Sequence, residues 1–489
     1  MPVKDGSHAN NRVESEAKSK GTIEYALRPY RIPTDVLREE HGAVLGMVTK
    51  LLGVTPRHCS YLMLWPPGYE TMSVLVPNLF NIPFCDFGLG TINGELRSLA
   101  AYVTSRSYGC GYCSAHCAAL GTIWRGDSLF LGKNAMAMHP NPPSSVFTAQ
   151  ELATINISKK VGNVPCDLQA EDIRQMASVL VPWEQEAVVN CTAVMGFLNR
   201  FMDTIGMTLE MEQIEIGETH LAESGWKAGI AYDPEADAEL MEDDKIEAIK
   251  REELNKNSGI WTFLKMLFGA KRADSVSLAK IPTTDKAITA RCREVAGFVP
   301  FYLTKMLHTN ARWAFAWTFL LRLNEGSEEV PVQLKQIMGY IVATNVSNTI
   351  LRAHFAFMAF RNGVSMQRLI NATNGESLDD TLSAKEVAAI TLAEATSFTP
   401  STMTPTLAGL LTRQYTPSGV IELLITVSVT FMYHRWTAVY VPMTYEPEVA
   451  AFVKEHGKAL GIDPVRPCTD EQATFEAVAA RERTKAQKE

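Results

Sequence analysis

The chain has 489 residues, of which 46% are hydrophobic, 20% charged and 9% aromatic. This composition is that of a globular protein, and the length predicts at least two cores, since a single core rarely grows beyond about 250–300 residues. Its 46 Lys and Arg against 54 Asp and Glu give a net charge of −8, which speaks against binding to nucleic acid or to an anionic membrane.

The chain begins with a polar stretch, and we assign residues 1–30 to an N-terminal tail. It has acidic residues such as Asp5 and Glu14 and no apolar signal core, so neither a secretory leader nor a transit peptide is expected. The longest apolar run, Val420 to Tyr433, contains Glu422 and is too short to span a membrane, so it predicts a buried helix. With nine cysteines and no leader, a reducing compartment is expected, and we predict a cytoplasmic protein with no membrane partner.

Helical periodicity runs through most of the chain. Apolar residues recur at three- and four-residue spacing, as in Leu96, Leu99, Ala100 and Val103, and clusters of proline and glycine separate such segments. The sustained alternation that a large sheet needs does not occur. The predicted fold class is therefore all-α.

Two parts of the chain resemble each other. The segment LRSLAAYVTSRSYGCGYCSAHCA matches LKQIMGYIVATNVSNTILRAHFA, and two further blocks match in the same order. In the last pair, Thr148 with Glu151 and Ser383 with Glu386 each form the capping-box signature of a helix start. Three matched blocks in one order predict a tandem duplication, with two helical lobes.

The lobes are separated by a segment of different composition, which contains an acidic run (Asp233 to Asp244), a mixed-charge helix (Lys245–Lys256) and an apolar-basic piece (Trp261 to Phe268). It is interpreted as a linker helix that folds back onto a lobe. The alternative is an amphipathic helix that touches a partner or membrane, which the acidic neighbours disfavour. The predicted domains are the tail at 1–30, a first lobe at 31–216, a charged helical insert at 217–285, a second lobe at 286–462 and a charged C-terminal tail at 463–489.

The segment YGCGYCSAHC holds three cysteines and a histidine within eight residues. If Cys110 opens a helix after Gly109, then Cys113, His116 and Cys117 project from the same stripe. A helix N-terminus stabilises a thiolate, a second thiol one turn away can capture a sulfenic acid, and an imidazole can move the proton. This pattern predicts redox-active thiols.

Other kinds of site agree less well with the spacing of these cysteines and the histidine. A zinc site lacks a second CxxC or HxxxH to complete its ligands, and a c-type haem signature needs histidine where Ser114 stands. A thioredoxin-type CxxC would follow a strand. Neither a phosphate loop nor a dinucleotide fingerprint occurs in a plausible context, so no metal and no organic cofactor are expected. The remaining cysteines are predicted to be packing or surface thiols: Cys59, Cys85, Cys166, Cys191, Cys292 and Cys468.

Both lobes resemble the alkyl-hydroperoxidase D-like/carboxymuconolactone decarboxylase superfamily over most of their length. The resemblance includes LRxLAxxxxxxxxGCxYCxAH, the segment Leu52–Leu64 and FTAQE…FLNRFMD. The family is all-α and often oligomeric, so a homo-oligomer of pseudo-dimeric chains is compatible with the resemblance. It implies a thiol peroxidase in which Cys113 attacks a hydroperoxide, Cys110 resolves the product as a disulfide, and an external dithiol re-reduces the site.

The sequence departs from the family motif at its proton relay. The family glutamate, twelve residues before Cys110, is Ser98 here, and Glu95 one turn earlier is the candidate substitute. Cys117 occupies the position of the relay histidine and is an alternative resolving thiol. His116, one residue earlier, is then the expected proton shuttle.

The second lobe has lost the CxxC pair, because Asn348 and Leu351 stand in its place, and only His354 persists. Either this lobe is a structural half that completes the pseudo-dimer, or it keeps a non-redox pocket with His308, His354 and His434.

We expect a thiol-dependent hydroperoxide reductase that acts on a small hydroperoxide, with Tyr112 and Trp124 as candidate pocket residues. Two alternatives stay open. One is a non-redox lyase, isomerase or decarboxylase of the carboxymuconolactone type, acting on a small carboxylated or lactone substrate. The other is a divergent scaffold that uses the insert to bind a partner.

Overall fold

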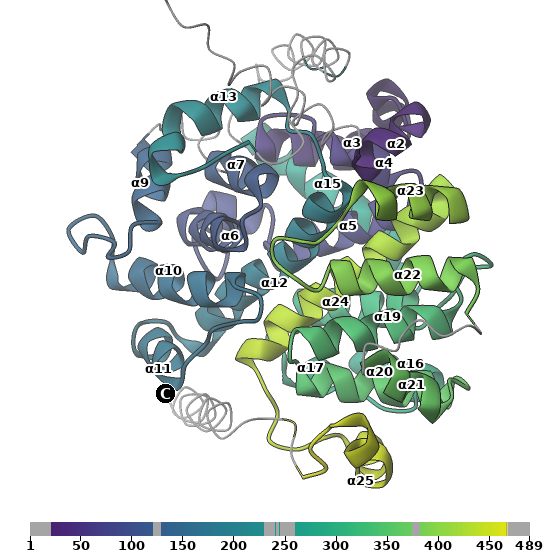
Figure 1. Ribbon diagram of the computed structural model, residues 1–489. Coiled ribbons are helices and arrows are strands. Elements are labelled where there is room, and N and C mark those ends of the chain that lie inside the picture. The colour runs from purple at the N-terminus through teal and green to yellow at the C-terminus, as the bar shows by residue number, and fades with distance from the viewer. Residues whose placement is uncertain are drawn as a thin grey trace, which may run out of the picture.

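The computed structural model describes residues 21–120, 129–228, 240, 244, 260–373, 382–465 and 467. Every regular element in these ranges is helical, which confirms the all-α fold class (Figure 1). Among the helices described, none is both long and apolar enough to cross a membrane.

The N-terminal half contributes α2 (Ile23–Leu27), η1 (Arg28–Tyr30), α3 (Thr34–Leu52), α4 (His58–Leu62), α5 (Pro66–Leu79), η2 (Phe84–Phe87), α6 (Gly94–Tyr108), α7 (Gly111–Ala119), α9 (Leu129–Ala137), α10 (Ala149–Gly162), α11 (Ala170–Val179), α12 (Pro182–Ile205), α13 (Met211–His220) and η3 (Ala222–Ser224). The C-terminal half contributes α15 (Ile260–Leu278), α16 (Asp285–Ala296), α17 (Phe301–Lys305), α18 (Thr309–Thr318), the π-helical turn η4 (Phe319–Leu323), α19 (Val332–Asn345), α20 (Thr349–Arg361), α21 (Met366–Thr373), α22 (Ala384–Ala395), α23 (Pro405–Gln414), α24 (Pro417–Val439) and α25 (Pro447–Leu460).

Helices in the two halves pair in a similar order. α6 packs against α7, α10 and α12, while α19 packs against α20, α22 and α24. Likewise, α10 contacts α11, and α22 contacts α23. The last helix of each series returns to the helix that follows the first: α13 packs on α7, and α25 packs on α20. The predicted capping boxes of Thr148 with Glu151 and Ser383 with Glu386 are present at the starts of α10 and α22 and are confirmed.

The long helices α12 and α24 pack against each other at the centre of the molecule (Figure 1). A Cβ atom at Gly196 would lie 2.6 Å from the carbonyl oxygen of Phe431, so only glycine lets the two backbones approach this closely. The apolar run from Val420 to Tyr433 lies within α24 and is fully buried, as predicted. One hydrophobic core therefore continues through both halves.

Two arginines are buried in this central contact. Arg200 on α12 and Arg435 on α24 have no exposed surface. The guanidinium carbon of Arg200 lies 3.8 Å from the ring centroid of Phe431, and both guanidinium groups lie over the ring of Tyr108, at 4.9 and 5.3 Å. The described residues thus place two positive charges close to the C-terminal end of α6, where the thiol segment begins.

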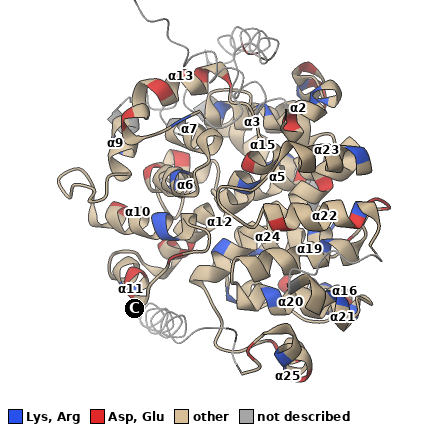
Figure 2. Cartoon of the chain, in the orientation of Figure 1, with Lys and Arg blue, Asp and Glu red and all other residues tan. Residues whose placement is uncertain are grey.

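The predicted boundary segments are ordered where they are described. Residues 23–30, placed in the tail by the sequence, form α2 and η1, and α2 packs against α23. In the insert, α15 folds back onto α3 and α5, with Met266 buried and Trp261 and Phe268 exposed by 66% and 65%. The Lys245–Lys256 segment and most of the acidic run lie outside the described residues. Figure 2 shows charges of both signs interspersed over the helices.

Candidate functional site

The thiol segment forms a turn between two helices. Gly109 ends α6 with φ +88°, a left-handed conformation that glycine adopts without steric cost. Cys110 then caps the N-terminus of α7, and its Sγ accepts a hydrogen bond from the Cys113 amide at 3.3 Å. The predicted helix start at Cys110 is therefore observed, with a sulfur in the place usually taken by a serine or aspartate oxygen.

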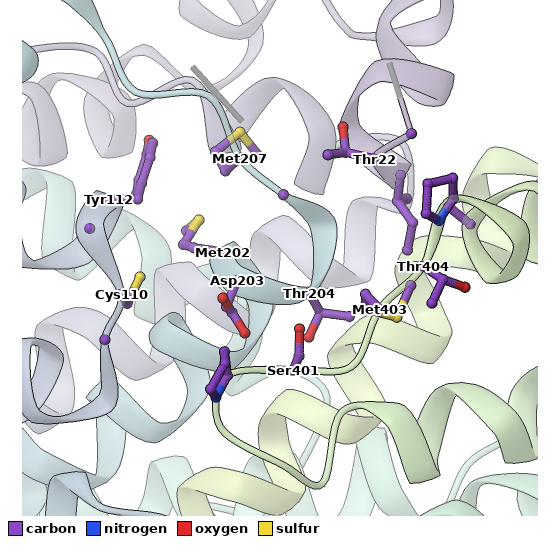
Figure 3. A pocket seen from close by; sticks show the side chains of 18 of the residues that line it. Thr22, Cys110, Tyr112, Met202, Asp203, Thr204, Met207, Ser401, Met403 and Thr404 are labelled. Atoms are coloured by element: carbon purple, nitrogen blue, oxygen red, sulfur yellow. The ribbon is translucent and has the colours of Figure 1, made fainter. Parts of the chain in front are cut away.

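The thiols face two different cavities. Cys110 lines a cavity of about 210 Å³ between the two halves, together with Asp203, Thr204 and Ser401 (Figure 3). Cys113 lines an apolar cavity of about 50 Å³. That small cavity is also lined by His116, Cys117, His58 and Tyr112. The single stripe expected from helical spacing therefore holds for Cys113, His116 and Cys117, whereas Cys110 opens to the other side.

His116 is paired with a carboxylate that lies far away in the sequence. Its Nε2 is 3.1 Å from Oε2 of Glu210, and its Nδ1 is 3.0 Å from the Tyr112 carbonyl oxygen, which can only accept a hydrogen bond. Both nitrogens of the ring thus face acceptors. Burial by itself would raise the pKa of Glu210, but His116 and Arg57 outweigh it and hold that pKa at about 2, so the carboxylate is ionised.

Glu210 is also the centre of a buried hydrogen-bond network. Its Oε1 accepts the Tyr112 hydroxyl at 2.8 Å and the Arg57 amide at 2.5 Å. Because the Tyr112 hydroxyl donates to Glu210, it accepts from Nδ1 of His58, 3.1 Å away. Burial and the nearby His116 lower the pKa of His58 to about 3, so this ring stays neutral.

Arg57 holds the chain that carries Glu210. Its guanidinium donates to the carbonyl oxygens of Thr208 and Leu209 at 2.9 and 3.1 Å and pairs with Asp244 at 2.7 Å. Asp244 in turn accepts the Met211 amide at 3.0 Å. The segment before α13 is therefore fixed on both sides of the glutamate, and its carboxylate is positioned by packing and hydrogen bonds.

Burial governs the acidity of the thiols. It raises the pKa of Cys113 well above the ordinary value, and the adjacent Cys110 thiol adds to this, while the positive charge of Arg435 opposes it. Burial also raises the pKa of Cys117 to about 12, although Ser105 and Arg97 favour its thiolate. In the resting protein both groups are therefore thiols at neutral pH.

The structure does not bring Glu95 to these thiols. Glu95 lies in the first turn of α6, whereas Cys110 follows the other end of that helix. One turn on from Glu95, Ser98 donates to the carbonyl oxygen of Leu120, beyond the C-terminal end of α7. The candidate carboxylate thus lies level with the far end of the thiol helix, and Glu210 takes the position beside His116.

The second half repeats the histidine–glutamate pair without the thiols. Asn348 caps α20 by accepting from the Leu351 amide at 3.1 Å, as Cys110 does for α7. His354 lies 2.9 Å from Oε2 of Glu446, and Oε1 of this glutamate accepts the Phe301 amide at 2.7 Å. The helix cap and the histidine–glutamate pair at α20 are therefore similar in geometry to those at α7.

The three histidines proposed for a pocket in the second half do not share one. His308 contacts the Trp183 carbonyl oxygen at 2.8 Å, and His434 contacts Asn348 at 3.1 Å and Cys166 at 3.5 Å. His354 is surrounded by aromatic rings, with the Phe298 centroid 4.7 Å away. Each histidine thus has its own partners.

The sequence reasoning missed Glu210, Arg57 and His58. A signal for the glutamate was present, because the tetrapeptide Met-Thr-Leu-Glu ending at Glu210 recurs as Met-Thr-Tyr-Glu ending at Glu446. Of the two aromatic candidates, Tyr112 lines both cavities, and Trp124 lies outside the described residues. Within the described ranges, no cluster of three or more His, Cys, Asp or Glu side chains is arranged to hold a metal ion.

Comparison with family models, with curated proteins and with solved structures found no match for this chain.

Proposed function

We propose that the protein is a thiol-dependent hydroperoxide reductase of the alkyl-hydroperoxidase D type, with a single redox site at the N-terminus of α7. The observation that carries the proposal is the arrangement of Cys110 as the helix cap, Cys113 one turn on, and the His116–Glu210 pair on the same helix face. Cys113 is the nucleophile and Cys110 the resolving thiol, and His116 is a proton carrier with Glu210 as its counter-ion.

In the first step His116 takes the proton of the Cys113 thiol, and the sulfur attacks the terminal oxygen of the hydroperoxide. The O–O bond breaks, the sulfur becomes a sulfenic acid and the leaving alkoxide takes a proton to become an alcohol. The small apolar cavity beside Cys113 suits a small hydroperoxide. The charge of Arg435 stabilises the thiolate against the cost of burial.

His116 is the proton carrier in this scheme. The Glu210 carboxylate beside Nε2 offsets the positive charge that the ring gains when it takes the Cys113 proton, and the ring then passes this proton to the leaving alkoxide. Glu210 stays ionised and keeps that proton available. Glu210 thus takes the role for which Glu95 was the sequence candidate.

In the second step the Cys110 thiol attacks the sulfenic acid, a disulfide forms and water leaves. Cys110 opens into the larger cavity between the halves, where an external dithiol can reach it and reduce the disulfide through a mixed-disulfide intermediate (Figure 3). The two cavities therefore separate oxidant from reductant. Cys117, which lines the small cavity, is the alternative resolving thiol.

The second half acts as a structural lobe in this proposal. The similar pairing order of its helices, the shared cap geometry and the repeated histidine–glutamate pair support a tandem pseudo-dimer. Asn348 and Leu351 replace the thiols, and aromatic rings surround His354, so the lobe retains the scaffold of the site without its nucleophiles.

A lyase or isomerase is the second candidate, and the raised pKa of Cys113 is the observation that favours it. The network of His58, Tyr112, Glu210 and His116 could transfer protons on a small acid or lactone without redox chemistry.

Hydroperoxide consumption in the presence of a dithiol separates the two candidates. We expect Cys113→Ser to abolish it and Cys110→Ser to stop turnover after one equivalent. Cys292→Ser, which changes a buried thiol in the other half, should leave the rate unchanged. Mass mapping after peroxide treatment should find a Cys110–Cys113 disulfide. Parent-like activity of Cys113→Ser would exclude the redox assignment.

A further inference from the structure

A third cavity, of about 290 Å³, lies at the N-terminal end of α20. Its walls come from both halves of the chain. Pro165 and Cys166, between α10 and α11, form one side, and Asn348, His434 and Thr437 form the other.

This cavity is built like the one beside Cys110, with the halves exchanged. At α7, the helix cap is Cys110 and the loop from the opposite half contributes Ser401. At α20, the cap is Asn348 and the opposite loop contributes Cys166. The cavity at α20 therefore has its thiol on the wall opposite the helix cap, and the proposed redox chemistry does not use this thiol.

Cys166 is partly exposed, whereas the other cysteines within the described ranges are buried. Its Sγ donates to the Val161 carbonyl oxygen at 3.4 Å and lies 3.5 Å from Nε2 of His434. The thiol is thus held in place on one side of the cavity by two contacts.

Asn348 determines which nitrogen of His434 carries the proton. Its Oδ1 accepts the Leu351 amide, so its Nδ2 faces Nδ1 of His434 at 3.1 Å and donates to it. Burial, together with the charges of Arg435 and Arg200, lowers the pKa of His434 to about 3, so the ring is neutral. The single ring proton therefore lies on Nε2 and points at the Cys166 sulfur, where it stabilises a thiolate.

The N-terminus of α20 supplies further donors to the cavity. Thr349 and Ile350 are its first two residues and line the cavity. The first amides of a helix have no partner within the helix and carry the positive end of its dipole. Among the described residues that line this cavity there is no aspartate or glutamate. A cavity with these donors favours a ligand that carries a carboxylate.

We propose that this cavity binds a small carboxylate-bearing disulfide and that Cys166 forms a mixed disulfide with it. The Cys166 thiolate attacks one sulfur of the ligand, whose S–S bond breaks as the new S–S bond forms. The departing thiolate takes up the proton lost by Cys166, so no other oxidant is needed. The role is modification of the protein, separate from hydroperoxide reduction.

Ligand binding is what gives the reaction its selectivity. Burial raises the pKa of Cys166 to about 12, with Arg435 opposing the shift, so only a small thiolate fraction is present near neutral pH. A bound anionic disulfide is held at high local concentration beside the Cys166 sulfur, so even a small thiolate fraction reacts with it. The reaction rate therefore saturates as the disulfide concentration rises.

The test uses the full chain with Cys110→Ser and Cys113→Ser, so that the proposed redox thiols cannot respond. Glutathione disulfide serves as the anionic probe and cystamine as the cationic one. We expect a glutathione adduct mapped to Cys166, with saturating kinetics and a rate about tenfold above that of cystamine. Equal rates for the two probes, or adducts spread over Cys59 and Cys191, would overturn the proposal.

Thr349→Pro tests the helix amides. Proline is well tolerated at the first helical position and removes one N–H, and Asn348 before it is already extended (φ −95°, ψ 92°). The preference for glutathione disulfide should fall below about threefold while the cystamine rate stays unchanged. A folded Thr349→Pro variant that keeps the full preference contradicts the assignment. In the otherwise unmodified chain, Cys166→Ser should consume hydroperoxide at the parent rate, which separates this proposal from the redox function.

Discussion

Nε2 of His116 lies 3.1 Å from Oε2 of Glu210, and the same relationship recurs in the second half between His354 and Glu446 at 2.9 Å. In both pairs the second carboxylate oxygen accepts an amide N–H at the start of a short helix, α4 or α17. A histidine–glutamate pair with this geometry is therefore present in each half. Among the described residues, only the pair in the N-terminal half stands beside cysteines, and this difference between the halves provides internal controls.

Replacing Glu210 with glutamine should reduce hydroperoxide consumption by about 100-fold, because an uncharged amide no longer stabilises protonated His116. Glu446→Gln changes the matching pair in the second half and should leave activity within about twofold of the parent, since no thiol depends on it. Steady-state rates and melting temperatures of both variants check this. Equal losses of activity would mean that both pairs act only through stability.

Acid should destabilise the protein through His58. Its pKa is lowered to about 3 in the folded protein from an ordinary 6.5, so the unfolded chain binds a proton first as the pH falls. Stability is then greatest above pH 6.5 and is lost between pH 6.5 and about 3, and His58 accounts for about 2 kcal/mol of that loss by pH 5.

The control for this prediction is His58→Asn, whose amide can still donate to Tyr112 but does not titrate. Urea unfolding at pH 7 and pH 5 should show a smaller loss of stability in the variant than in the parent. The same loss in both proteins would contradict a neutral, buried His58.

The close contact of α12 with α24 predicts opposite effects for two glycine substitutions. Gly196→Ala places a methyl group 2.6 Å from the Phe431 carbonyl oxygen, so the helices must move apart, at a cost of about 2 kcal/mol. Gly46→Ala, within α3, meets no atom within 4 Å and should stabilise the protein by about 0.5–1 kcal/mol. Denaturant unfolding measures both. A neutral Gly196→Ala would show that this contact adapts easily.

Arg435→Met should separate stability from thiol reactivity. The arginine is wholly buried, and burial lowers its pKa to about 10, so an apolar side chain of similar length is expected to fold as well or better. Its charge favours the Cys113 thiolate, so alkylation of Cys113 should slow by about tenfold. Timed alkylation with peptide mapping, alongside thermal melting, tests both parts. An unchanged alkylation rate would show that the charge of Arg435 does not affect the reactivity of Cys113.

The sequence by itself determined the features that depend on neighbouring residues. Helical periodicity, the capping boxes at Thr148 and Ser383, and the start of α7 at Cys110 are local, because a helix and its caps are made within a few residues. The apolar run in α24 was long enough to indicate burial without any knowledge of its partner.

The tertiary structure alone decided which groups meet. Glu95 is closer in sequence to the thiols than Glu210, yet the antiparallel packing of α6 and α7 carries it to the far end, while α13 returns Glu210 to His116. Likewise, Cys166 and His434 come from opposite halves of the chain. Side-chain chemistry and spacing indicate what a residue can do, but the packing of helices over long distances fixes its partners, and those contacts leave no local pattern in the sequence.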